Sequence, residues 1–159
     1  MHATVATTVL LAFAAAAPAQ QSRPLESCPL LATTDAATLT GPGVEFYSGR
    51  EATGQGGLKT YLCFFGVGQG RSLTVKTGPS LAKTAAEYQK MYEPLRRMSN
   101  EQVEPGLGEY AYSKLEGGAA DMNVVKGALI LSLELKGDDL KPADLDKLRA
   151  AAKKALAKL

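Results

Sequence analysis

Apolar and polar residues alternate along several stretches of the chain, which is the pattern of a strand with one buried face. Six segments show it and are predicted to be strands: 44–48, 58–67, 72–77, 109–115, 121–126 and 128–136. In the last segment four leucines share one face, which we expect to be buried: Leu129, Leu131, Leu133 and Leu135. The strands fall into two groups of three.

Two longer segments repeat apolar residues at spacings of three and four, the pattern of a helix packed on a sheet. The first begins at Pro79-Ser80, ends between Pro94 and the region of Asn100, and has this stripe: Leu81, Ala85, Tyr88, Tyr92 and Leu95. The second begins at Pro142 and has this one: Leu145, Leu148, Ala152, Ala155 and Leu159. A shorter helix is predicted from Thr33, a plausible N-cap, to Leu39.

The connections between consecutive strands are short, which favours antiparallel pairing. We therefore expect the α+β class: an antiparallel twisted sheet of about five to six strands, with two longer helices and one short N-terminal helix packed mainly on one face. At 159 residues, the chain has little room for a second domain. The expected organisation is a single α+β domain at 27–159, preceded by a flexible polar tail at 20–26.

The N-terminal segment has the pattern of a signal peptide. Residues 8–17 form an uncharged apolar run, and the small residues of Ala17-Pro18-Ala19 predict cleavage before Gln20, with a signal peptide at 1–19. The run is too short to span a bilayer, so we expect export to the periplasm or the medium and no stable membrane insertion after cleavage. The alternative is an uncleaved helix that tethers the protein to the membrane.

Export determines the interpretation of the two cysteines, Cys28 and Cys63. An isolated pair in an oxidising compartment usually forms a structural disulfide, and that is the prediction here. A Cys-x-x-Cys spacing typical of redox sites is absent, and two sulfurs without histidine do not make a standard zinc site.

Charge and composition argue against several functions. Lys and Arg number 18 against 16 Asp and Glu, a net charge of +2, which does not predict a nucleic-acid partner. The one histidine is His2, which the predicted cleavage removes. Because histidine is the commonest general base and metal ligand, we expect a protein without metal or cofactor and without catalytic activity.

One motif suggests catalysis. Ser80 and Lys83 form a Ser-x-x-Lys at a predicted helix start, and Lys76-Thr77-Gly78 lies just upstream. Both strings belong to the signature of serine β-lactamases and penicillin-binding proteins, where a lysine activates the serine. In those enzymes the Lys-Thr-Gly string comes long after the serine, so an N-cap role for Ser80 is favoured. A hydrolase using Ser80 and Lys83 is kept as an alternative.

Two glycine-rich segments are candidate binding loops, because loops on a rigid sheet often carry binding residues. Their residues are Gly54, Gly56 and Gly57 in the first segment and Gly66, Gly68, Gly70 and Arg71 in the second. The second segment precedes a predicted strand rather than a helix, which argues against a phosphate-binding loop. A further alternative is a carrier of a small apolar ligand, held in a cavity between Tyr88, Tyr92 and the leucines of the last strand.

Several short motifs resemble a known group of domains. The chain resembles small exported domains of unknown function from bacterial envelopes. The motifs that carry the resemblance are Cys28-Pro29-Leu30-Leu31-Ala32-Thr33, Gly41, Cys63-Phe64-Phe65 and Gly106-Leu107-Gly108-Glu109-Tyr110-Ala111. The order of elements is similar to that of PsbP/Mog1-like α/β sandwiches. The resemblance implies a non-catalytic envelope module whose partner is an envelope protein or a small ligand, and it implies no active-site residues.

The leader prediction is checked by the mass of the exported protein. We expect intact-mass spectrometry of material from the periplasm or the medium to show loss of residues 1–19 and a chain that begins at Gln20, because signal peptidase cleaves after Ala19. A full-length mass in the membrane fraction would favour the tethering helix instead.

Overall fold

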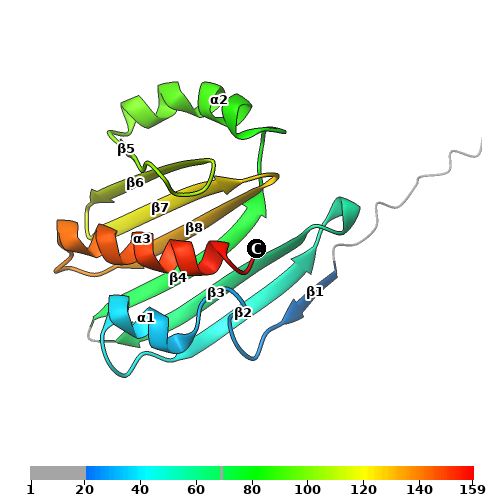
Figure 1. The fold of residues 1–159 in the computed structure, drawn as a ribbon. Helices are drawn as coiled ribbons and strands as arrows, with labels where there is room; N and C mark the ends of the chain where they lie inside the picture. The colour runs from blue at the N-terminus through cyan, green and yellow to red at the C-terminus, as the bar shows by residue number, and fades with distance from the viewer. Residues whose placement is uncertain (1–20, 69) are drawn as a thin grey trace, which may run out of the picture.

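The computed structural model describes residues 21–68 and 70–159, and within them one antiparallel sheet has eight strands in the order β1-β2-β3-β4-β8-β7-β6-β5 (Figure 1). The strands are β1 (Gln21–Pro24), β2 (Phe46–Thr53), β3 (Lys59–Gly68), β4 (Arg71–Pro79), β5 (Gln102–Val103), β6 (Tyr110–Glu116), β7 (Ala119–Lys126) and β8 (Leu129–Lys136). The helices are α1 (Thr33–Thr40), α2 (Ala85–Met98) and α3 (Pro142–Leu156), with a short 3-10 turn η1 (Gln55–Gly57).

The predicted fold was wrong in its details, although the α+β class holds. The sheet has eight strands rather than five or six, because β1 and β5 add one short strand at each edge. The first described element is the strand β1 rather than a helix, and α1 follows it. The helices are also divided between the two faces of the sheet, with α1 and α3 on one and α2 on the other.

Part of the segment predicted to be a flexible tail belongs to the sheet. Its residues from Gln21 to Pro24 form β1, which pairs antiparallel with β2. The Arg23 guanidinium pairs with the carboxylate of Glu51 on β2, at 3.3 Å. Polar residues with a proline are typical of an edge strand, which explains why no strand pattern was visible there.

Strands β4 and β8 join the two halves of the sheet. They pair antiparallel from Ser72–Lys136 to Pro79–Leu129, without a register shift. Strands β1 to β4 lie on one side of this junction and β5 to β8 on the other. The junction is apolar on one face, where Leu73, Val75 and Leu133 have at most 1 % of their surface exposed.

We call the face of the sheet that α1 and α3 cover the first face. It contains the main core. Its strands contribute Cys63, Phe65, Leu73, Val75, Ala111, Ala120, Met122, Val124, Leu131, Leu133 and Leu135. The helices contribute Ala36, Leu39, Leu148, Ala151, Ala152 and Ala155. Small alanines on α3 let the helix approach the sheet closely, and Leu148 is completely buried between them.

Two charged side chains hold α3 against the sheet. The Arg71 guanidinium, at the start of β4, donates to Asp144 at the start of α3 and to the carbonyl of Leu39 near the end of α1. The buried carboxylate of Glu104 accepts hydrogen bonds from the Arg149 guanidinium of α3 and from the hydroxyl of Ser113 on β6. Each carboxylate is therefore paired, as burial requires.

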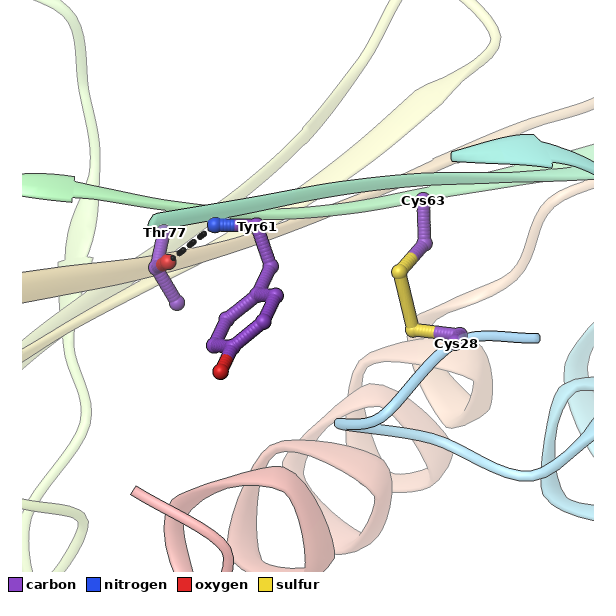
Figure 2. The surroundings of a disulfide bond; sticks show 4 residues. All are labelled: Cys28, Tyr61, Cys63 and Thr77. Atoms are coloured by element: carbon purple, nitrogen blue, oxygen red, sulfur yellow. Dashed lines mark hydrogen bonds between the residues drawn. A yellow bond between two sulfur atoms is a disulfide. The ribbon is translucent and has the colours of Figure 1, made fainter. Parts of the chain in front are cut away.

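The disulfide predicted from the sequence is confirmed: Cys28 is bonded to Cys63, with 5.7 Å between their Cα atoms (Figure 2). Cys28 lies in the segment before α1 and Cys63 lies in the middle of β3, on the first face. The bond ties the N-terminal segment to the core. Beside it, the amide of Tyr61 donates to the Thr77 hydroxyl of β4 at 2.9 Å (Figure 2).

Helix α2 begins later than predicted. Its first residue is Ala85 rather than Pro79 or Ser80, because Thr84 is the N-cap and accepts from the amide of Glu87. Pro94 lies inside the helix, which ends at Met98, between Pro94 and Asn100 as predicted. Among the described residues, no helix is long and apolar enough to cross a membrane, and the predicted leader lies outside them.

Removing the disulfide should destabilise the fold. We expect the double variant Cys28→Ala, Cys63→Ala to lower the free energy of unfolding by about 4 kcal/mol, because the bond closes a separation of 35 residues in the unfolded chain. Urea denaturation of wild-type protein and variant measures the difference, and the wild type with reductant is the matched control. Equal stability of all three samples would contradict the prediction.

Candidate functional site

The second face of the sheet lies opposite α1 and α3, and among residues 21–68 and 70–159 it is covered only at one end, by α2. There Tyr88 and Tyr92 of α2 pack on Tyr110 and Tyr112 of β6. The rings of Tyr92 and Tyr112 stack with 4.5 Å between their centroids. The hydroxyls of Tyr88 and Tyr112 share a hydrogen bond of 3.0 Å. These four tyrosines anchor α2 to β6.

Charged groups at the rim of this tyrosine cluster strengthen the attachment. The hydroxyl of Tyr92 donates to the Glu101 carboxylate at 3.0 Å. Burial raises the pKa of Tyr92 to about 12, and the neighbouring Glu101 acts in the same direction. The guanidinium groups of Arg96 and Arg97 hold the pKa of Glu93 at about 2. The phenol of Tyr92 therefore stays protonated at neutral pH, and it serves as a hydrogen-bonding anchor.

Beyond the tyrosines, the side chains of the second face line up in two cross-strand rows. The strand registers place these residues in the first row: Arg50, Leu62, Lys76, Ser132, Asn123 and Tyr112. They place these in the second row: Ser48, Phe64, Thr74, Glu134, Asp121 and Lys114. Each row crosses from β2 to β6, a reach of about 24 Å at about 4.8 Å per strand. Together they form a face that is apolar near β3 and polar near β7.

Two hollows lie along these rows. One, of about 330 Å³, is lined by Leu62 and Phe64 of β3 together with Ser48, Gly49 and Arg50 of β2. Phe64 has 40 % of its surface exposed there, unusual for a ring on a sheet face. The other hollow, of about 110 Å³, is lined mainly by polar side chains of β4, β7 and β8. The face thus offers an apolar contact beside a set of hydrogen-bonding groups.

Asp121 is the most perturbed acid on this face. Burial raises its pKa, and the carboxylate of Glu134, directly opposite on β8, raises it further. The ammonium groups of Lys136 and Lys76 act in the other direction. Lys136 is paired with Glu134 at 3.1 Å. Beside them the Ser132 hydroxyl donates to the Asn123 side-chain oxygen at 2.6 Å. Two carboxylates that face each other across a strand pair destabilise this part of the sheet.

The chemistry available on this face is hydrogen bonding, charge pairing and apolar contact. In the part of the chain that the structure describes, no group of three or more His, Cys, Asp or Glu residues has a metal-binding arrangement. The two rows contain hydroxyls, an amide, lysines, an arginine and carboxylates, together with the apolar side chains of Leu62 and Phe64. Such a surface can bind and orient a ligand.

The structure does not bring the predicted glycine loops together. Gly54, Gly56 and Gly57 lie between β2 and β3, whereas Gly70 lies in the turn between β3 and β4, at the opposite end of β3 (Figure 1). At about 3.3 Å per residue, the 10 residues of β3 separate them by about 30 Å. Gly66 and Gly68 belong to β3 itself. The two loops therefore cannot form one binding site.

Arg71, the charged residue of the second loop, is already engaged. Its guanidinium donates to Asp139 at 2.7 Å, besides its bonds to Asp144 and to the Leu39 carbonyl. Only 14 % of its side chain is exposed. Arg71 therefore holds α3 in place rather than facing a ligand.

The two alternative functions also meet geometric obstacles. Ser80 follows β4 and accepts a hydrogen bond from the amide of Ala82, while Lys83 lies before α2 and is exposed. The helical spacing that would set this lysine one turn beyond the serine is therefore missing. For the apolar carrier, Tyr88 and Tyr92 lie on the second face, whereas Leu131, Leu133 and Leu135 lie on the first. One cavity cannot be lined by both sets.

The sequence analysis missed the two rows. The available signal was the polar residues that alternate with the buried ones, such as Thr74 and Lys76 on either side of Val75. Their alignment into rows depends on the pairing of β4 with β8, which lie far apart in the sequence.

Asp121 should cost stability at neutral pH, because its folded pKa lies above the ordinary value of 3.8 and its charged form is therefore disfavoured in the fold. We expect Asp121→Asn to raise the free energy of unfolding by about 0.5 kcal/mol at pH 7. The gain should shrink as the pH falls through the folded pKa and vanish below 3.8, where the wild-type carboxyl is neutral in both states.

Denaturation of both proteins across this pH range measures the difference. Asp138→Asn, on the exposed turn after β8, is the matched control and should show no such pH-dependent gain. A loss of stability in Asp121→Asn at pH 7 would contradict the account of this face.

Comparison of the chain with protein-family models, with curated proteins and with solved structures found no match. The resemblance to PsbP/Mog1-like sandwiches and to exported envelope domains therefore stays a prediction. The functional argument depends on the contacts and charges of the second face.

Proposed function

We propose that the protein is an exported, non-catalytic binding module of the bacterial envelope, stabilised by its disulfide. The observation that carries the proposal is the second face of the sheet, where two cross-strand rows extend beyond the part that α2 covers. The partner is an envelope protein or a small ligand that lies across β3, β4, β8 and β7.

Three features of the face support a binding role. Phe64 exposes 40 % of its surface next to a hollow of about 330 Å³, within the range of ligand sites. The polar hollow of Ser132 and Asn123 supplies donors and acceptors about two strands away. The first face, by contrast, is closed by α1 and α3. A partner with an apolar group and a hydrogen-bonding group fits the second face.

Export is supported by the leader sequence together with the disulfide. The apolar run at 8–17 predicts entry into the secretory pathway. The bond between Cys28 and Cys63 is of a kind that persists in oxidising compartments. The two observations are independent, because one lies in the leader and the other in the core.

The non-catalytic part of the proposal is tested by covalent labelling. Ser80 hydrogen-bonds the amide of Ala82, and no helical turn connects it to Lys83. We therefore expect a fluorophosphonate probe and a fluorescent penicillin to leave the purified protein unlabelled. Labelling that is lost in Ser80→Ala would contradict the proposal and favour the hydrolase alternative.

The binding face is tested by capture with matched variants. We expect the wild-type protein, immobilised and exposed to envelope extract of the source bacterium, to retain a partner that Phe64→Asp retains at least about tenfold less well. The physical reason is the loss of the exposed ring and the introduction of a charge into the apolar hollow. Quantitative mass spectrometry of the retained material gives the ratio.

Lys153→Glu is the control, because Lys153 is exposed on α3, away from the second face. It should retain the partner as well as the wild type does. Equal capture by all three proteins, or capture by none, would contradict a binding role for this face.

A further inference from the structure

The outer edge of β6 is only partly paired, and the missing part lies beside a hollow. Strand β5 contributes two residues, which pair Gln102 with Ser113 and Val103 with Tyr112. The amide of Glu104 extends this pairing by donating to the carbonyl of Ala111. In this register, residue 100 would lie opposite Leu115. The chain leaves the edge before it reaches that position.

Asn100 diverts the chain. Its φ of 56° is in the left-handed region. Among the described residues, Asn100 is the one residue other than glycine with such a φ. The next amide, of Glu101, donates back to the carbonyl of Arg96 at the end of α2. The chain therefore turns from α2 onto the edge only at Gln102. No residue of the described chain occupies the strand position opposite Leu115.

The backbone of Leu115 points outward at this position. Successive residues of a strand direct their amide and carbonyl groups to opposite sides. Because the Ala111 carbonyl accepts from Glu104 on the outer side, the amide and the carbonyl of Leu115 also point there. Within residues 21–68 and 70–159, neither group has a hydrogen-bond partner. An extended chain would satisfy both.

A hollow of about 320 Å³ lies at the same place. Leu115, Pro142 and Leu145 give it an apolar side, and Asn100, Gln102 and Glu116 give it a polar rim. The side chain of Leu115 lies on the first face, where Pro142 and Leu145 at the start of α3 also lie. A residue placed opposite Leu115 would share that face, since cross-strand partners do. Its side chain would therefore enter the hollow between Leu115 and α3.

We propose that this edge binds an extended peptide segment of a partner protein by strand addition, in continuation of β5. The peptide residue opposite Leu115 exchanges two backbone hydrogen bonds with it and places an apolar side chain in the hollow. Backbone pairing provides affinity and the hollow provides selectivity, as in other cases of strand addition. This surface is separate from the two rows of the second face.

The test uses the protein purified from the periplasm or the medium, with phage-displayed random eight-residue peptides as the probe. We expect selection of peptides with an apolar residue flanked by residues of strand propensity. A selected peptide should slow hydrogen exchange of the Leu115 amide at least about tenfold and leave the Lys114 amide unchanged, because the latter points toward β7. Methylation of the backbone nitrogen opposite Leu115 should abolish binding, and methylation of the adjacent nitrogen should not.

Two protein variants complete the test. Pro142→Arg fills the hollow and should weaken binding at least about tenfold. Ala143→Arg is the matched control, because it adds the same charge to the next exposed residue of α3 but does not line the hollow. Failure to select any peptide, equal binding to both variants, or binding that Phe64→Asp removes instead would overturn the proposal.

Discussion

The pairing of β4 with β8 is the interaction on which the rest of the structure depends. These two strands pair continuously from Ser72–Lys136 to Pro79–Leu129. They join two groups of four strands into one sheet. The strands come from opposite halves of the chain, so the pairing costs considerable loop-closure entropy. Burial of Leu73, Val75 and the leucines of β8 on the first face offsets that cost. The disulfide stabilises the fold further, because it fixes the N-terminal segment to β3.

The same junction produces both candidate binding surfaces. On the second face it aligns Thr74 with Glu134 and Lys76 with Ser132, which makes the rows continuous from β2 to β6. On the first face it supports α3, and the start of that helix forms one side of the hollow at the outer edge of β6. The closed first face directs a ligand to the second face or to an edge. In physical terms, the protein buries one side of a sheet and leaves the other side and one edge position available.

Local patterns predicted the central strands well and the edges poorly. Leu131, Leu133 and Leu135 alternate and are buried as expected, whereas β1 and β5 carry no alternation and were missed. An edge strand has one neighbour and little burial, so selection for apolar residues is weak there. Which face α2 covers depends on the contact of Tyr88 with β6, which helical periodicity does not encode. The rows and the empty position opposite Leu115 depend on long-range register, and no local pattern predicts it.

Amide hydrogen exchange measured by NMR along β4 and β8 tests the central claim most directly. If this pairing unites the sheet, the amides of both strands exchange as slowly as those in the middle of β3 and β7 and open only in global unfolding. Fast exchange of the amides that pair β4 with β8, with slow exchange retained in β3 and β7, would show two separately stable halves. That result would contradict the continuous face on which the proposed function rests.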